Sequence, residues 1–203
     1  MKTPSMPTPT PLIADEAART PRERHSLWTI VLHWSTVIAM LVATAAVLWR
    51  EATENEPLRV ALMGIHRQAG VFVLVALGLR LAVRFGIGIA NHAGDMPWTL
   101  RWAARLAHAA LYLMLFALPL LGLAASNAHA VQVTLFGLVP LPILVHEDSD
   151  LADTLTDYHL WASWGMLLLV VAHVAAACWH HLVRKDGVLA AMLPTVKRPR
   201  ATP

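Results

Sequence analysis

The sequence predicts an all-α integral membrane protein, a four-helix bundle with up-down-up-down topology. Of its 203 residues, 57% are hydrophobic and only 14% are charged, whereas soluble domains carry about 25% charged residues. Four segments are apolar over the roughly 20 residues that a transmembrane helix needs. Short connections between most of them favour an antiparallel bundle, the architecture that holds cofactors between facing helices.

The four spans are predicted at about residues 27–49, 58–85, 97–125 and 151–183. Pro57 suits the start of the second helix and Gly86 its end. Asp95 is expected to cap the third helix, and Ser149 or Asp150 the fourth. Each span therefore has both the length and the local end signals of a helix.

The remaining segments are predicted to lie outside the bilayer. Residues 1–24 are rich in Pro, Thr and charge and lack an apolar signal-peptide core, so we expect a disordered cytoplasmic tail. Residues 195–203 form a second, basic tail, which leaves residues 25–194 as the membrane domain. The apolar segment "VTLFGLVPLPILV", residues 133–145, is short and interrupted by two prolines, so we expect a loop against the outer surface.

The distribution of basic residues predicts the orientation. Thirteen of the sixteen Lys and Arg residues fall in the two tails or around the connection between the second and third spans, and the other three are Arg50, Arg59 and Arg67. Cytoplasmic segments of membrane proteins carry an excess of Lys and Arg. Both termini are therefore predicted to be cytoplasmic. The opposite side is acidic, with Glu51, Glu54, Glu56, Glu147, Asp148, Asp150, Asp153 and Asp157.

Histidines stand out in the fourth span, "YHLWASWGMLLLVVAHVAAACWHH". His159 and His173 are fourteen residues apart, which places them within roughly 40° of each other and about 21 Å apart along the helix axis. His180 continues the same face toward the cytoplasm. The spacing predicts a stripe of imidazoles that runs from one leaflet to the other.

Histidines in the first two spans match this stripe in depth. His33 is expected at the level of His173, and His66 at the level of His159. Two stacked bis-imidazole sites are the simplest arrangement, and haem iron accepts two axial histidines. Each layer offers too few ligands for zinc. Histidines that only hydrogen bond between helices are the alternative, and a transporter or scaffold without redox activity remains a competing class.

The combined motifs resemble the bacterial cytochrome b561 family of di-haem membrane cytochromes. They are "LHW" in the first span, "IH" followed by "AG" in the second, "AH…Y…ALPLLGL" in the third, the His-x13-His…HH ending of the fourth, and "RKDGVLAAMLP". The resemblance implies four helices in the bacterial inner membrane and two haem b groups. It carries over His33, His66, His159 and His173 as axial ligands.

The resemblance also implies electron transfer between a periplasmic-side donor and the quinone pool, with ubiquinone as partner. Some members oxidise superoxide, so a superoxide:ubiquinone oxidoreductase is one hypothesis, although the acidic outer side disfavours an anionic donor. The alternative is an anchor subunit for a periplasmic dehydrogenase or hydrogenase. Lipid, quinone and a periplasmic redox protein are the expected partners, and no nucleic acid is expected.

Three further residues are candidates for cofactor binding. Arg80 is expected at the depth of the inner haem, where it would pair with a propionate or simply extend toward the cytoplasmic surface. His108 is the alternative inner ligand, or a propionate or quinone contact. His180 is a candidate quinone contact and proton relay, because imidazole exchanges protons near neutral pH. A plain interfacial position is the competing interpretation for His180.

Overall fold

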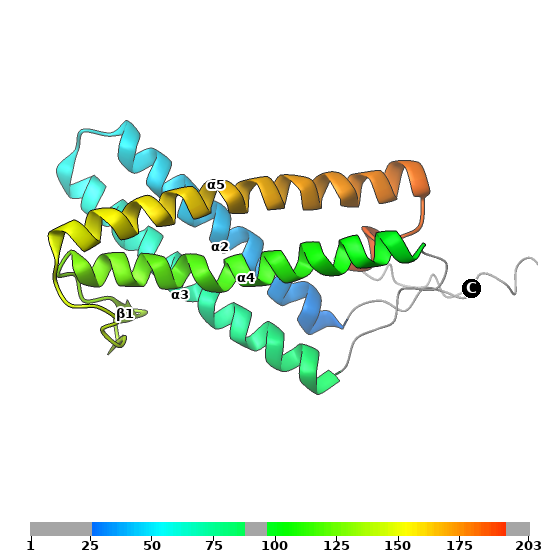
Figure 1. Cartoon of the computed structure of the whole chain (residues 1–203), viewed down its shortest axis with the longest axis horizontal. Helices are drawn as coiled ribbons and strands as arrows, with labels where there is room; N and C mark the ends of the chain where they lie inside the picture. Colours follow the sequence, from blue (N-terminus) through cyan, green and yellow to red (C-terminus); the bar gives the residue numbers. More distant parts are fainter. Residues whose placement is uncertain (1–25, 88–96, 194–203) are drawn as a thin grey trace, which may run out of the picture.

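The computed structural model describes residues 26–87 and 97–193, which form four long helices (Figure 1). They are α2 (Leu27–Ala52), α3 (Glu56–Ile87), α4 (Trp98–Ala128) and α5 (Ser149–Trp179). All four are long and apolar enough to cross a membrane. The predicted spans are thus confirmed, while both tails and the proposed cap Asp95 lie outside the described residues.

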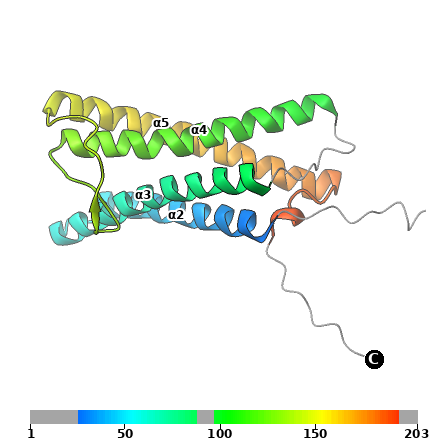
Figure 2. The same ribbon diagram turned by 90° about the horizontal axis from the view of Figure 1, so that it is seen from below.

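The four helices run alternately in opposite directions, as predicted (Figures 1 and 2). Neighbours in sequence pack as pairs: α2 lies along α3, and α4 lies along α5. The two pairs contact each other mainly through α3 and α4. The backbones of α2 and α5, and those of α3 and α5, make few contacts with each other.

Local hydrogen bonds set where the helices begin. Ser26 Oγ accepts from the N–H of Thr29 at the start of α2, and an asparagine before α3 does the same for that helix. The prediction of Ser149 or Asp150 as the cap of α5 is wrong. Asp148 has the extended backbone of a cap and accepts from the N–H of Leu151 at 2.9 Å, whereas Ser149 is already helical.

The ends of the helices differ from the predicted bounds by a few residues. Pro57 lies in the first turn of α3, as expected, and α4 continues three residues further than predicted, to Ala128. The α-helical part of α5 stops at Trp179, and residues His180–Arg184 follow as a π-helix. Short π-helical segments occur mostly at functional sites.

The connection between α4 and α5 contains a small β-hairpin that the sequence did not predict. Strand β1 (Thr134–Leu135) pairs antiparallel with β2 (Val139–Pro140). Phe136 and Gly137 between them have φ values of 49° and 77°, the positive φ at both central positions that a type I′ turn requires. The predicted loop is therefore an ordered hairpin at the end of the bundle.

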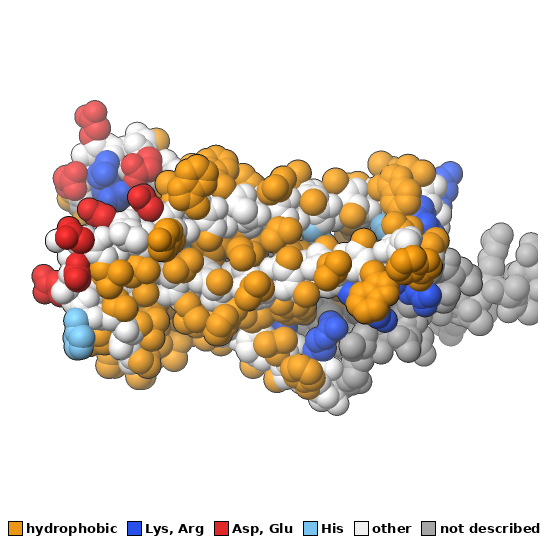
Figure 3. All heavy atoms as spheres, in the orientation of Figure 1, with side chains coloured by type: hydrophobic (Ala, Val, Ile, Leu, Met, Phe, Trp, Pro, Cys, Tyr) orange, Lys and Arg blue, Asp and Glu red, His pale blue; other side chains and the backbone are white. Residues whose placement is uncertain are grey.

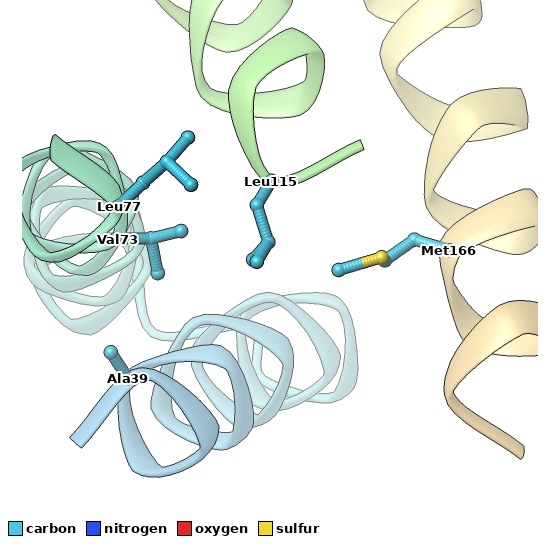
Figure 4. Close-up of a cluster of buried hydrophobic side chains, with 5 residues drawn as sticks. All are labelled: Ala39, Val73, Leu77, Leu115 and Met166. Carbon is cyan, nitrogen blue, oxygen red and sulfur yellow. The ribbon is translucent and has the colours of Figure 1, made fainter. Parts of the chain in front are cut away.

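A layer of apolar side chains fills the middle of the bundle (Figure 4). Every helix contributes to it, through Ala39, Val73, Leu77, Leu115 and Met166, all at most 7% exposed. Such a layer is dry and closely packed. It separates the two ends of the bundle, where the histidines lie.

The two ends of the bundle carry opposite charge (Figure 3). Acidic side chains gather where α2 meets α3 and where α5 begins, and we call this the acidic end. Basic side chains gather at the other end, where α3 and α5 finish and α4 begins, and we call this the basic end. Between them most apolar side chains face outward, as helices surrounded by lipid require.

Candidate functional site

At the acidic end the structure brings His66 of α3 and His159 of α5 together, as predicted. Their ring centres are 5.9 Å apart and the ring planes are inclined by 81°. Two imidazoles that bind one metal ion from opposite sides have ring centres roughly 6 Å apart, because each metal–nitrogen bond is about 2 Å. The pair therefore has the separation of two axial ligands.

Backbone carbonyls orient both imidazoles of this pair. His66 Nδ1 lies 3.0 Å from the carbonyl oxygen of Ala43, and His159 Nδ1 lies 3.1 Å from that of Leu118. A carbonyl oxygen only accepts, so each Nδ1 carries the proton and each Nε2 has its lone pair free. Histidine ligands are oriented in this way in metal sites generally.

Gly122 of α4 is a residue of this site that the sequence analysis did not single out. A Cβ atom built on Gly122 would lie 3.2 Å from His159 Cε1 and 3.4 Å from His159 Nδ1. The absence of a side chain lets the imidazole reach Leu118, one turn earlier on the same helix. No sequence signal specific to this role was available, since one glycine in an apolar helix has several explanations.

At the basic end one imidazole, that of His173, has two imidazole neighbours. His33 of α2 lies 6.5 Å from His173 of α5, measured between ring centres, and His108 of α4 lies 5.5 Å from the same ring. His108 Nδ1 is 2.6 Å from the carbonyl oxygen of Ala104 in its own helix. Both separations are compatible with axial ligation, so His108 stays an alternative to His33.

Arg80 of α3 lies beside this cluster, at the predicted depth. Its Nη2 is 3.4 Å from His33 Nδ1, and its guanidinium stacks 5.4 Å from the ring centre of Tyr112. Because a guanidinium only donates, His33 Nδ1 is the acceptor in this contact, and a neutral His33 then carries its proton on Nε2. His33 would therefore offer a lone pair to a metal ion only after the guanidinium moves away, whereas the carbonyls at the acidic end leave both Nε2 atoms without a proton.

His180, where the π-helix begins, has an acidic partner that the sequence analysis missed. Its Nδ1 lies 2.5 Å from Asp186 Oδ2, and Arg184 Nε approaches the same oxygen at 3.3 Å. Both side chains are largely buried, at 14% and 13% exposed. Trp179 covers one edge of the imidazole, with ring centres 5.3 Å apart. The two partners are six residues apart, and the chain turns back between them through Lys185 at φ 52°.

The donor set suits a planar cofactor with two axial ligands. Among residues 26–87 and 97–193, no three His, Cys, Asp or Glu side chains converge as a metal cage would require. Both predicted pairs instead link helices whose backbones make few contacts with each other. Met166 of the apolar layer lies seven residues from both His159 and His173, so the two pairs are separated by a dry region.

Comparison with known proteins identifies the family. Residues 24–195 match the family described as prokaryotic cytochrome b561. Cytochrome b561 homolog 2 of Escherichia coli (strain K12) is 29% identical over 84% of this chain and 92% of its own length. Cytochrome b561 homolog 1 of the same organism is 32% identical over 86% of this chain and 99% of its own. A protein of Yersinia pestis named probable superoxide oxidase CybB is 26% identical over 85% and 97%. The chain therefore belongs to the prokaryotic cytochrome b561 family, as a multi-pass haem b protein of the bacterial inner membrane that transfers electrons.

Proposed function

We propose that the protein transfers electrons through two haem b groups from a donor at the acidic end to a quinone at the basic end. His66 and His159 would hold one haem, and His33 and His173 the other. The observation that carries this proposal is the presence of two histidine pairs, 5.9 Å and 6.5 Å between ring centres, on opposite sides of one apolar layer. The haems supply the one-electron chemistry, while the helices fix their spacing and keep the path dry.

The proposed orientation places the basic end in the cytoplasm. It follows from the excess of Lys and Arg at that end. The acidic end would then face the periplasm and its electron donors. Quinone would be reduced near the cytoplasmic surface, where protons are taken up.

His180 and Asp186 are the proposed proton donors for quinone reduction. Reduction of a ubiquinone to the quinol takes up two electrons and two protons. His180 lies at the basic end, seven residues beyond His173, and its Nδ1 is held by Asp186. When Nε2 is also protonated, it would donate that proton to a quinone carbonyl, while Asp186 orients the ring through Nδ1. The proton would be replaced from the cytoplasm.

The haem content tests the proposal most directly. We expect two haem b per chain, by the pyridine haemochrome assay against amino-acid analysis, and oxidation of both by added ubiquinone-1 after chemical reduction. One haem per chain, or two haems that ubiquinone-1 does not oxidise, would contradict it.

Replacing His180 tests the quinone site separately. His180→Ala is expected to keep both haems but to slow their oxidation by ubiquinone-1, measured by stopped-flow absorbance. His181→Ala is the matched control, because His181 is the exposed neighbour on the same segment. Equal rates in the two variants would remove His180 from the quinone site.

The electron donor at the acidic end has two candidates. The name of the Yersinia pestis relative supports superoxide, while the acidic surface repels an anion. A dehydrogenase or hydrogenase subunit anchored at this end is the second candidate, supported by the acidic side chains gathered there, which suit a basic partner protein. If superoxide is the donor, superoxide generated by pulse radiolysis should reduce the haems of the purified protein. If the donor is an anchored subunit, it should not.

A further inference from the structure

We infer that the segment between α4 and α5 rests in the bilayer interface at the acidic end and contacts the acyl chains of that leaflet. The segment is residues 131–145, which we call the acidic-end hairpin. The inference concerns contact with lipid and does not depend on the number of haems or on the electron acceptor. It rests on composition, exposure, hydrogen bonding and position.

The acidic-end hairpin is apolar and exposed in surroundings that are charged. It has no Asp, Glu, Lys or Arg, whereas Glu147 and Asp148 follow it directly. Its most exposed large side chains are Leu138 at 83%, Ile143 at 61%, Val139 at 56% and Phe136 at 50%. Side chains of this kind are costly to leave in water as one continuous patch.

Several backbone groups of the hairpin form hydrogen bonds with protein side chains, as a segment with little access to water requires. Gln68 of α3 binds it twice, donating from Nε2 to the carbonyl of Thr134 at 3.1 Å and accepting from the N–H of Phe136 at 3.0 Å. Gln132 donates to the carbonyl of Leu141 at 2.8 Å. Close to hydrocarbon every backbone polar group needs a protein partner, since water is scarce.

One face of the hairpin is anchored on the helices, which leaves the other face outward. Val133 is 5% exposed and packs with Val71 of α3 and Leu123 of α4, and Leu135 and Leu141 pack against them. The hairpin is folded back beside the helices instead of projecting beyond their ends (Figures 1 and 2). Its outward side chains thus adjoin the apolar belt of the bundle (Figure 3).

The same end carries aromatic side chains that mark a bilayer boundary. Tyr158, Trp161 and Trp164 of α5 are 59%, 74% and 61% exposed, and Tyr and Trp concentrate at the level of lipid headgroups. Lipid is therefore the occupant that the surroundings favour.

Site-directed spin labelling tests this placement. Cys178→Ser removes the one native cysteine, and Leu138→Cys then carries a nitroxide in protein reconstituted into nanodiscs. Collision with oxygen, which concentrates in lipid, is compared with collision with a water-soluble nickel chelate. Leu168→Cys, on a 70% exposed lipid-facing position, is the lipid reference. Glu147→Cys, on the charged end of the same connection, is the water reference.

The label at residue 138 is expected to show a higher ratio of oxygen to nickel collisions than the label at residue 147, in the direction of residue 168. Ile143→Cys is expected to behave in the same way and serves if Leu138→Cys folds poorly. A ratio at both positions equal to that at residue 147 would overturn the inference and would leave the hairpin as a surface for a soluble partner. Because the experiment measures lipid contact, its outcome does not depend on haem content or on quinone reduction.

Discussion

The two ends of the bundle hold their histidines in different ways. At the acidic end two imidazoles face each other, and carbonyls of α2 and α4 orient both. At the basic end His173 has two imidazole neighbours, His33 and His108, and a guanidinium touches His33. The first arrangement allows one pair of ligands, whereas the second leaves His173 with two neighbours. The acidic-end site is thus rigidly specified, and the basic-end site is more polar and more adaptable.

This contrast suits the proposed roles of the two sites. A donor site needs a fixed geometry, whereas an acceptor site must also move protons. The basic end has the side chains for that work, namely His108, Tyr112 and the pair of His180 and Asp186.

Removal of an acidic-end ligand is expected to have the largest effect. His66→Ala or His159→Ala leaves only one histidine for that haem, so haem content should fall from two per chain to one, measured by pyridine haemochrome. The remaining haem should keep its bis-histidine spectrum. Loss of both haems, or of neither, would contradict independent sites.

A comparison of His33→Ala with His108→Ala tests which of the two histidines is the haem ligand at the basic end. We expect His33→Ala to lose the basic-end haem and His108→Ala to retain it with a changed low-spin electron paramagnetic resonance signal. The physical reason is that α4, which carries His108, packs along α5, whereas α2, which carries His33, makes few contacts with α5. A porphyrin between His108 and His173 would have to separate two packed helices. The reverse result would make His108 the ligand.

Gly122→Ala is expected to act on the acidic-end haem alone. The new methyl group would displace the His159 imidazole from the carbonyl of Leu118. A hydrogen bond that orients a histidine ligand changes metal affinity by about 10–100-fold, and we expect haem affinity to fall by about tenfold. The midpoint potential of this haem should rise, because the ligand becomes less basic. Potentiometric titration measures both haems in one experiment.

Gly165→Ala is the matched control for this change. Gly165 lies on α5, and a Cβ there would meet nothing within 4 Å. It should leave both potentials unchanged. Identical titrations for Gly122→Ala and the control would show that His159 adjusts without cost.

Arg80→Gln is expected to have the smallest effect and to act at the basic end. Removing a positive charge near His33 favours the oxidised, more positive haem, so its midpoint potential should fall. A tenfold change in a one-electron equilibrium corresponds to about 59 mV, and we expect a shift on the order of tens of millivolts. Arg84→Gln, at an exposed position on the same helix, should shift it less.

The spans and the histidine pairing could be predicted because both follow from helix periodicity. Fourteen residues between His159 and His173 determine their depth and direction on any straight helix. The cap at Asp148 was missed because three consecutive polar residues could all serve. The hairpin was missed because its turn depends on the φ values of Phe136 and Gly137, which an apolar run interrupted by prolines does not reveal.

Contacts between distant segments could not be predicted from the sequence, for a different reason. The approach of Gly122 to His159 and of His108 to His173 depends on how α4 is rotated against α5. The bond between His180 and Asp186 depends on the π-helix and on Lys185 at φ 52°. Periodicity places a side chain on a helix face, but it does not state which neighbour that face meets.

The packing of the helices as two pairs has a consequence for how fast the protein is degraded in the cell. Each predicted histidine pair takes one ligand from the α2–α3 pair and the other from α5. Iron ligation at the two proposed sites would therefore cross-link two halves that otherwise meet mainly through α3 and α4. A newly made chain without its porphyrins lacks both cross-links and is the better substrate for membrane proteases, so the abundance of the protein should follow the supply of haem.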